Sequence, residues 1–230
     1  MTFGIIHYAY LTEALLMTVC VLLLVRRFVS QRNRMTLVFT FFILGYALLC
    51  FLYFGRGFFD QGVDGSILMY RSGMVVSAVI PAILAVFMVY PMVAAKGGLS
   101  KAKPLACLLL VLWLMAIVAA FLLMIGTVGF SFSFNDFDVY STTFAPLSYT
   151  AIVAIPISIA VVDALAMALM YMRETEAFFR MRALLLLVGW VVVLSGQVML
   201  LSATTLVLNP VLITSGTLLM AAAILRRKPS

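Results

Sequence analysis

Long apolar runs constrain this chain more than any other feature. Seven stretches are long and apolar enough to cross about 30 Å of hydrocarbon as helices. They lie at about 6–25, 35–54, 72–94, 104–127, 148–171, 183–203 and 207–225. A bilayer core offers no water to satisfy backbone N–H and C=O groups, so runs of this length must be helical. We therefore predict an all-α, polytopic membrane protein, with residues 1–230 forming a single seven-helix transmembrane domain.

The composition agrees with this class. Hydrophobic residues make up 66% of the chain and charged residues only 10%, against roughly 25% charged residues in an ordinary soluble domain. The first run has no basic segment before it and no small-residue cleavage site after it. We therefore expect a retained helix and not a signal peptide.

The basic residues predict the orientation. Thirteen of the 15 Lys and Arg residues fall in segments that the predicted topology places on one side, near 26–34, 96–103, 173–182 and 226–228. The opposite side holds Arg56 and Arg71 with several aspartates. The positive-inside rule then places the N-terminus outside and the C-terminus in the cytoplasm, with the chain integral to the plasma (cell inner) membrane. The net charge of +7 thus reflects topology and attraction to anionic membrane lipids, and it does not indicate a nucleic-acid partner.

Polar side chains inside the outer half of the predicted spans are the candidate ligand-binding residues. Glu13 shares a face of the first span with Tyr10, Gln197 lies at similar depth in the sixth span, and Arg71 lies beside Tyr70 near the outer mouth of the third. Facing lipid would cost roughly 2.5–3.5 kcal/mol for a charged side chain, so we expect these groups to face the bundle interior. Two interpretations stay open: a polar, ligand-binding cavity, or hydrogen bonds that join helices at about 0.6–2 kcal/mol each.

Asp163 lies near the middle of the fifth span. Small residues recur at every fourth position beside it, at Ala160, Ala164 and Ala168. This spacing allows a neighbouring helix to approach closely. No basic residue lies at its depth, so we expect a neutral carboxyl that forms an interhelical polar contact. Three alternative partners are open: Ser77, Ser195 or the backbone carbonyl that Pro156 leaves unpaired. The alternative is a proton- or ion-sensing role.

Three other features carry local predictions. In the outer connection GFSFSFNDFDVYSTTFAP, aromatic and small residues alternate, which favours an extended or hairpin segment. It serves either as an interfacial aromatic belt or as a lid or docking surface. Asn209 and Pro210 predict the start of the last helix, with Asn209 as its cap. Pro81 and Pro156 fall inside spans, and we expect them to bend their helices.

Catalytic and metal-binding motifs are missing from the sequence. It has one histidine and no HExxH, paired-carboxylate or glycine-rich phosphate motif. We predict that the chain is not an enzyme and uses no metal or cofactor. Its cysteines, Cys20, Cys50 and Cys107, fall inside predicted spans and are expected to act as small packing residues.

Three segments share a pattern of charge and hydropathy. A basic turn precedes an apolar second helix (RRFVSQRNRMTLVFTFFILGYALLCFLYF), a short basic linker enters the sixth (EAFFRMRALLLLVGW), and the seventh starts at Asn-Pro and ends in arginines (NPVLITSGTLLMAAAILRR). This pattern resembles the N-terminal seven-transmembrane sensor region of bacterial histidine kinases. The resemblance implies a membrane sensor, and because no kinase domain follows Arg227 in this chain, the signal would pass to a separate protein partner.

We therefore expect a sensor-like or receptor-like module whose ligand arrives from the outer side. The alternative is an accessory or structural subunit of a larger membrane complex. A small proton-coupled transporter built on Asp163 is a third interpretation.

Overall fold

The structure, a computed structural model, describes residues 5–59, 64–97, 130–134, 140–144, 154–199 and 208–226. Its helices are α1 (Ile5–Gln31), α2 (Arg34–Gly55), η1 (Arg56–Phe58), α3 (Asp64–Gly97), α6 (Ile155–Arg173), α7 (Ala177–Met199) and α8 (Leu208–Leu225). Within these residues, six helices are long and apolar enough to cross a membrane. They correspond to six of the predicted spans. The span predicted at 104–127 lies outside the described residues, and the count of seven stays a prediction.

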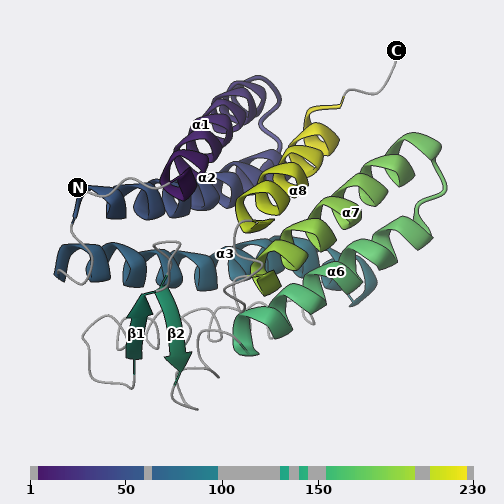
Figure 1. The fold of residues 1–230 in the computed structure, drawn as a ribbon. Coiled ribbons are helices and arrows are strands. Elements are labelled where there is room, and N and C mark those ends of the chain that lie inside the picture. The colour runs from purple at the N-terminus through teal and green to yellow at the C-terminus, as the bar shows by residue number, and fades with distance from the viewer. Residues whose placement is uncertain are drawn as a thin grey trace.

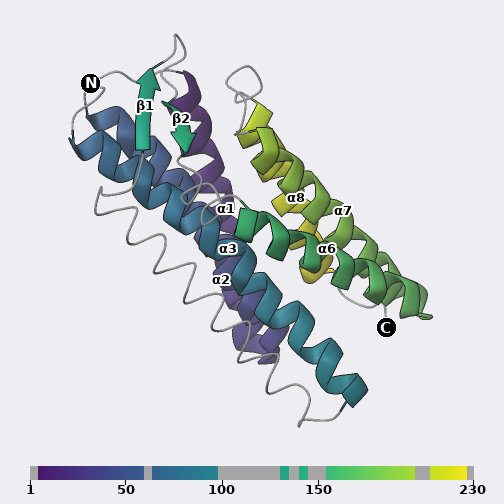
Figure 2. The same ribbon diagram turned by 90° about the horizontal axis from the view of Figure 1, so that it is seen from below.

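The six long helices form a bundle in which the last helix returns to the first. Each helix packs on its neighbour in the order α1, α2, α3, α6, α7, α8, and α8 also contacts α1 and α2. Figures 1 and 2 show α1, α2 and α3 as one group and α6, α7 and α8 as a second group beside it.

The core where the two groups meet is aromatic. Trp190 of α7 is fully buried, and its ring centre lies 5.6 Å from that of Phe42 of α2 in an edge-on contact. The indole Nε1 of Trp190 donates a hydrogen bond to the Ala160 carbonyl of α6 at 2.9 Å. One side chain thus joins α2, α6 and α7.

Helices α7 and α8 pack closely through glycine. A Cβ atom placed on Gly189 would lie 2.7 Å from the carbonyl oxygen of Gly216, and one placed on Gly216 would lie 2.5 Å from the carbonyl oxygen of Gly189. The backbones therefore approach as small residues allow in membrane helix pairs.

Several helix boundaries differ from the predicted ones. Helix α1 continues to Gln31, beyond the predicted end near 25, and α3 begins at Asp64 and not near 72. Hydropathy marks only the part of a helix inside the membrane, whereas the ends have their own signals. Arg32 adopts a positive φ of 51°, a conformation that commonly ends helices, and Asp64 places a negative charge in the first turn of α3, where the helix dipole favours it.

The proline predictions have different outcomes. Pro81 lies well inside α3, as predicted. Pro156 is the second residue of α6, and residues 148–153, the earlier part of its predicted span, lie outside the described residues. Ala154 before it already has helical dihedral angles, so the predicted bend at Pro156 stays a prediction.

The connection between the fourth and fifth predicted spans contains a β-hairpin, which confirms the prediction of an extended or hairpin segment. Strand β1 (Phe130–Phe134) pairs antiparallel with β2 (Tyr140–Phe144), and the register sets Phe130 opposite Phe144 and Phe134 opposite Tyr140. Figure 2 shows it at the end of the bundle where α1 and α3 begin. The all-α prediction thus describes the membrane helices but omits this small sheet.

Candidate functional site

Glu13 of α1 is buried, with 2% of its surface exposed. The Cys50 thiol of α2 and the Thr214 hydroxyl of α8 face its carboxyl, but neither forms a hydrogen bond with it. Within the described part of the chain, neither carboxyl oxygen has a hydrogen-bond partner, and the same holds for the buried hydroxyl of Thr217 on α8. The two Glu13 carboxyl oxygens thus lie between α1, α2 and α8, and no described group donates a hydrogen bond to them.

A hydrogen-bonded chain lies close to Glu13. The Tyr10 hydroxyl of α1 donates to Oδ1 of Asn209 at 3.4 Å, and Nδ2 of Asn209 donates to the Gly196 carbonyl of α7 at 2.8 Å. These two buried hydrogen bonds join α1, α8 and α7.

The predicted capping role of Asn209 is wrong. Helix α8 begins at Leu208, so Asn209 and Pro210 do mark its start. The Asn209 side chain, however, bonds to the neighbouring helices and not to its own backbone. The Asn-Pro pair signalled the boundary, but nothing local distinguishes a cap from an interhelical amide.

A row of three tyrosines, Tyr10, Tyr53 and Tyr70, crosses α1, α2 and α3. The Tyr10 and Tyr53 ring centres are 5.1 Å apart, and those of Tyr53 and Tyr70 are 6.0 Å apart and stacked. The guanidinium of Arg56 lies 5.9 Å from the centre of the Tyr53 ring and 5.5 Å from that of Tyr70. We call these three tyrosines the tyrosine row.

Arg56 is a residue that the sequence interpretation missed. It is 7% exposed although it was assigned to an outer loop, because a lone Arg after an apolar run looks like a solvated charge. The usable signal was Tyr53, three residues earlier, which places a ring under the guanidinium.

The structure links four of the five predicted ligand-binding residues. Tyr10, Glu13 and Tyr70 lie on or beside the tyrosine row. The Tyr46 hydroxyl of α2 lies close to Glu13 and faces the Gln197 side chain. Arg71 is half-buried on α3, directly after Tyr70, and the Arg56 guanidinium packs on the tyrosine row.

Asp163 is fully buried on α6, and neither of its carboxyl oxygens has a hydrogen-bond partner among the described residues. The predicted bonds to two serines are wrong. The Ser77 hydroxyl donates to the Met74 carbonyl at 2.8 Å and that of Ser195 to the Val191 carbonyl at 2.9 Å, so each bonds within its own helix. The carbonyl freed by Pro156 lies outside the described residues.

The alanine ladder beside Asp163 does face other helices. Ala160 is 1% exposed and its carbonyl accepts the Trp190 hydrogen bond. Ala164 is partly buried against the core. Asp163 therefore lies on a packed face of α6, as predicted, but without the expected hydrogen bond.

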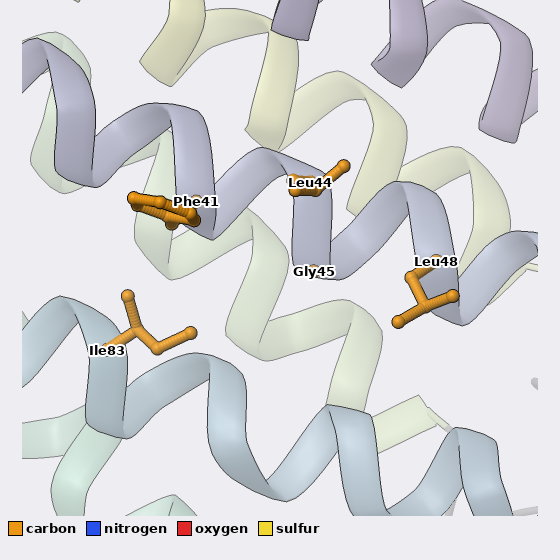
Figure 3. Close-up of a pocket in the computed structure, with 5 residues that line it drawn as sticks. All are labelled: Phe41, Leu44, Gly45, Leu48 and Ile83. Atoms are coloured by element: carbon orange, nitrogen blue, oxygen red, sulfur yellow. The ribbon is translucent and has the colours of Figure 1, made fainter.

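An apolar groove of about 350 Å³ opens between α2 and α3. It is lined by Phe41, Leu44, Gly45, Leu48 and Ile83 (Figure 3). These side chains offer a ligand no polar group that would orient it, so we do not assign the groove as the site.

The described part of the chain contains no candidate metal site, and its two cysteines are free thiols. No three His, Cys, Asp or Glu residues gather there in a way that could hold an ion. Cys20 and Cys50 are buried free thiols, in keeping with a packing role, and Cys107 lies outside the described residues.

Comparison of the chain with models of known protein families and with curated proteins found no match. A function for this chain must therefore be proposed from its own residues. The resemblance to the kinase sensor region stays a prediction.

Proposed function

We propose that this chain is a sensor-like module of the plasma membrane that binds a small polar ligand at Glu13 and signals through a separate protein partner. The observation that carries the proposal is the buried Glu13 carboxyl, whose two oxygens have no hydrogen-bond partner in the described part of the chain. Leaving a buried polar group unsatisfied costs about 1–3 kcal/mol. A residue that served only to join helices would be expected to form the bonds that recover this cost, whereas a ligand-binding residue keeps them for its ligand.

The surroundings define what the ligand must supply. The described groups that face Glu13 are a thiol and a hydroxyl, so among the described residues no cation neutralises a charged carboxylate there. A ligand with N–H or O–H donors, such as an amine, an amino acid or a sugar, complements these oxygens. Tyr10, Arg56 and Asn209 are all at least nine-tenths buried, so the ligand is small and the tyrosine row must rearrange to admit it.

The same contacts offer a route for the signal. Glu13 lies between α1, α2 and α8, and the hydrogen-bonded chain from Tyr10 through Asn209 reaches α7. A ligand that bound Glu13 would change the spacing of α1 and α8. A conformational response requires that the ligand bind the two arrangements with different affinity, and we propose that the contacts at this junction provide it.

A thermal-shift screen tests the proposal. The full chain, purified in mild detergent, is heated with a panel of amines, amino acids and sugars. A specific ligand at 100 times its Kd should stabilise the folded protein by about 2.7 kcal/mol. We expect the shift to disappear in Glu13→Gln and to persist in Thr12→Ala, which changes an exposed neighbour on α1. A ligand shift that is equal in wild type and Glu13→Gln contradicts the proposal. If no compound shifts the unfolding temperature and one large membrane protein always co-purifies, the accessory-subunit interpretation is favoured.

A second candidate function, proton-coupled transport, rests on Asp163. Its carboxyl is fully buried and has no hydrogen-bond partner within the described residues, and an ionisable group inside a membrane span is a site hypothesis by default. Proteoliposomes under an imposed pH gradient should then take up protons in wild type and not in Asp163→Asn. Equal proton uptake in both proteins would remove this candidate.

A further inference from the structure

Three guanidinium groups from separate segments meet where α8 ends. Arg27 of α1 donates hydrogen bonds to the carbonyls of Leu225 and Arg226. Arg182 of α7 donates from Nε to the Ala223 carbonyl at 2.9 Å. Arg226 follows the last residue of α8. We call Arg27, Arg182 and Arg226 the basic end.

Phe178 holds two of these groups in place. The guanidinium of Arg182 lies 5.8 Å from the centre of the Phe178 ring, and that of Arg226 lies 5.7 Å from the same centre. Two side chains that share one ring, one of them also bound to a backbone carbonyl, have lost much of their rotational freedom before any ligand arrives. Ligand binding then costs less conformational entropy.

Positive charge gathers at the basic end, beside the C-terminus of α8. The C-terminus of a helix carries about half a negative charge, whereas three guanidiniums carry three positive charges. Arg27 and Arg182 lie close enough for their charges to act on each other. An anion placed among them would relieve that repulsion.

The geometry selects phosphate among anions. Arg182 uses Nε for the Ala223 carbonyl, and within the described residues its two terminal NH2 groups stay available for another acceptor. A planar guanidinium donates two parallel bonds to phosphate oxygens, and it is less strongly hydrated than an ammonium. We propose that the basic end is a binding site for a phosphate group, carried either by an anionic phospholipid headgroup or by a soluble phosphate compound. This site is separate from Glu13, and its existence does not depend on the proposed sensor function.

Two double variants with the same loss of charge test the site. Arg182→Gln with Arg226→Gln removes two members of the basic end. Arg26→Gln with Arg173→Gln removes two exposed arginines that were assigned to the same membrane side. The full chain in mild detergent is titrated with phosphatidylglycerol or phosphatidylcholine and examined by native mass spectrometry. Inorganic phosphate is titrated separately in a thermal-shift assay.

We expect wild type to bind phosphatidylglycerol more tightly than phosphatidylcholine, and affinity to fall about fivefold for each arginine removed from the basic end. The control pair should keep the wild-type preference. Displacement of phosphatidylglycerol by inorganic phosphate identifies a site for soluble phosphate compounds, and resistance to displacement identifies a lipid site. Equal weakening in both double variants, or no response to either phosphatidylglycerol or phosphate, overturns the proposal.

Arg226→Gln alone guards against a folding defect. Arg226 contributes a ring contact and its backbone carbonyl, so the bonds that Arg27 and Arg182 donate to the end of α8 persist in this variant. A folded Arg226→Gln protein with unchanged affinity for phosphatidylglycerol and phosphate would equally overturn the proposal.

Discussion

Adding one methyl group at Gly189 tests the α7–α8 contact. A Cβ there would lie 2.6 Å from Cγ of Met220 and 2.7 Å from the carbonyl oxygen of Gly216. Overpacking a well-packed site costs about 1–3 kcal/mol, and Gly→Ala inside a helix recovers about 1 kcal/mol through propensity. Because one obstructing atom belongs to the backbone, the helices must separate, and the overpacking cost should lie at the upper end of that range. We expect Gly189→Ala to lower the free energy of unfolding by about 2 kcal/mol.

Unfolding by SDS in mixed micelles measures this change, and two glycines of the chain provide controls. At Gly55 the nearest atom to a Cβ is Sδ of Met69 at 3.6 Å, an ordinary contact, so Gly55→Ala should be neutral or stabilising. At Gly45 the nearest atom, at 2.9 Å, is a side-chain carbon of Ile80, and no backbone atom is among its contacts, so a smaller loss is expected. If Gly189→Ala proves as stable as Gly55→Ala, the close backbone contact between α7 and α8 is wrong.

Three further substitutions can be measured in the same unfolding assay. Asn209→Leu removes both interhelical hydrogen bonds of that side chain and leaves the Gly196 carbonyl unpaired, so we expect a loss of about 1–2 kcal/mol; unchanged stability would refute the bridging role. Tyr10→Phe removes only the longer 3.4 Å bond, and its cost should stay near 0.6 kcal/mol, the average for such bonds in membranes; a loss as large as that of Asn209→Leu would contradict this ranking. Trp190→Phe keeps a ring against Phe42 but loses the indole N–H, so we expect about 1–2 kcal/mol of destabilisation; a neutral result would mean that the 2.9 Å bond to α6 is not formed.

The helices could be predicted from the sequence because an apolar run of twenty residues in a bilayer can satisfy its backbone hydrogen bonds only as a helix. Their ends could not. Residues 64–71 extend α3 by two turns before its apolar run, and residues 26–31 extend α1 beyond its own. Hydropathy does not predict where a helix ends once it has left the hydrocarbon, because there the backbone can form hydrogen bonds with water in any conformation.

The identity of the polar residues inside the bundle was predictable, but their partners were not. Burial of Glu13 and Asp163 follows from the cost of placing an ionisable group in lipid. Partners depend on which helix lies opposite, and that is decided by packing between distant segments. Ser77 and Ser195 illustrate the limit, because a helical serine has a carbonyl of its own helix within reach, and in the structure both take it.

For Asn209 and Arg56 the error is the reverse of that for the serines: a local role was predicted, and the side chain contacts other helices. Each has a simple local interpretation, as a helix cap and as a loop charge. The Asn209 bonds span 199 positions to Tyr10 and 13 positions to Gly196, and no local pattern encodes such distances. Arg56 is covered by rings that the tyrosine row contributes from two helices.

The free energy of unfolding of Glu13→Met tests most directly whether Glu13 is reserved for a ligand. The methionine side chain is similar in length to that of glutamate and packs well in an apolar core. The substitution removes a buried carboxyl that has no hydrogen-bond partner in the described part of the chain. A ligand-binding residue held without partners should destabilise the free protein, so Glu13→Met is expected to raise the free energy of unfolding by about 1–3 kcal/mol while abolishing any ligand-induced shift. A loss of stability in Glu13→Met would instead show that the carboxyl holds α1, α2 and α8 together, and would contradict the proposed site.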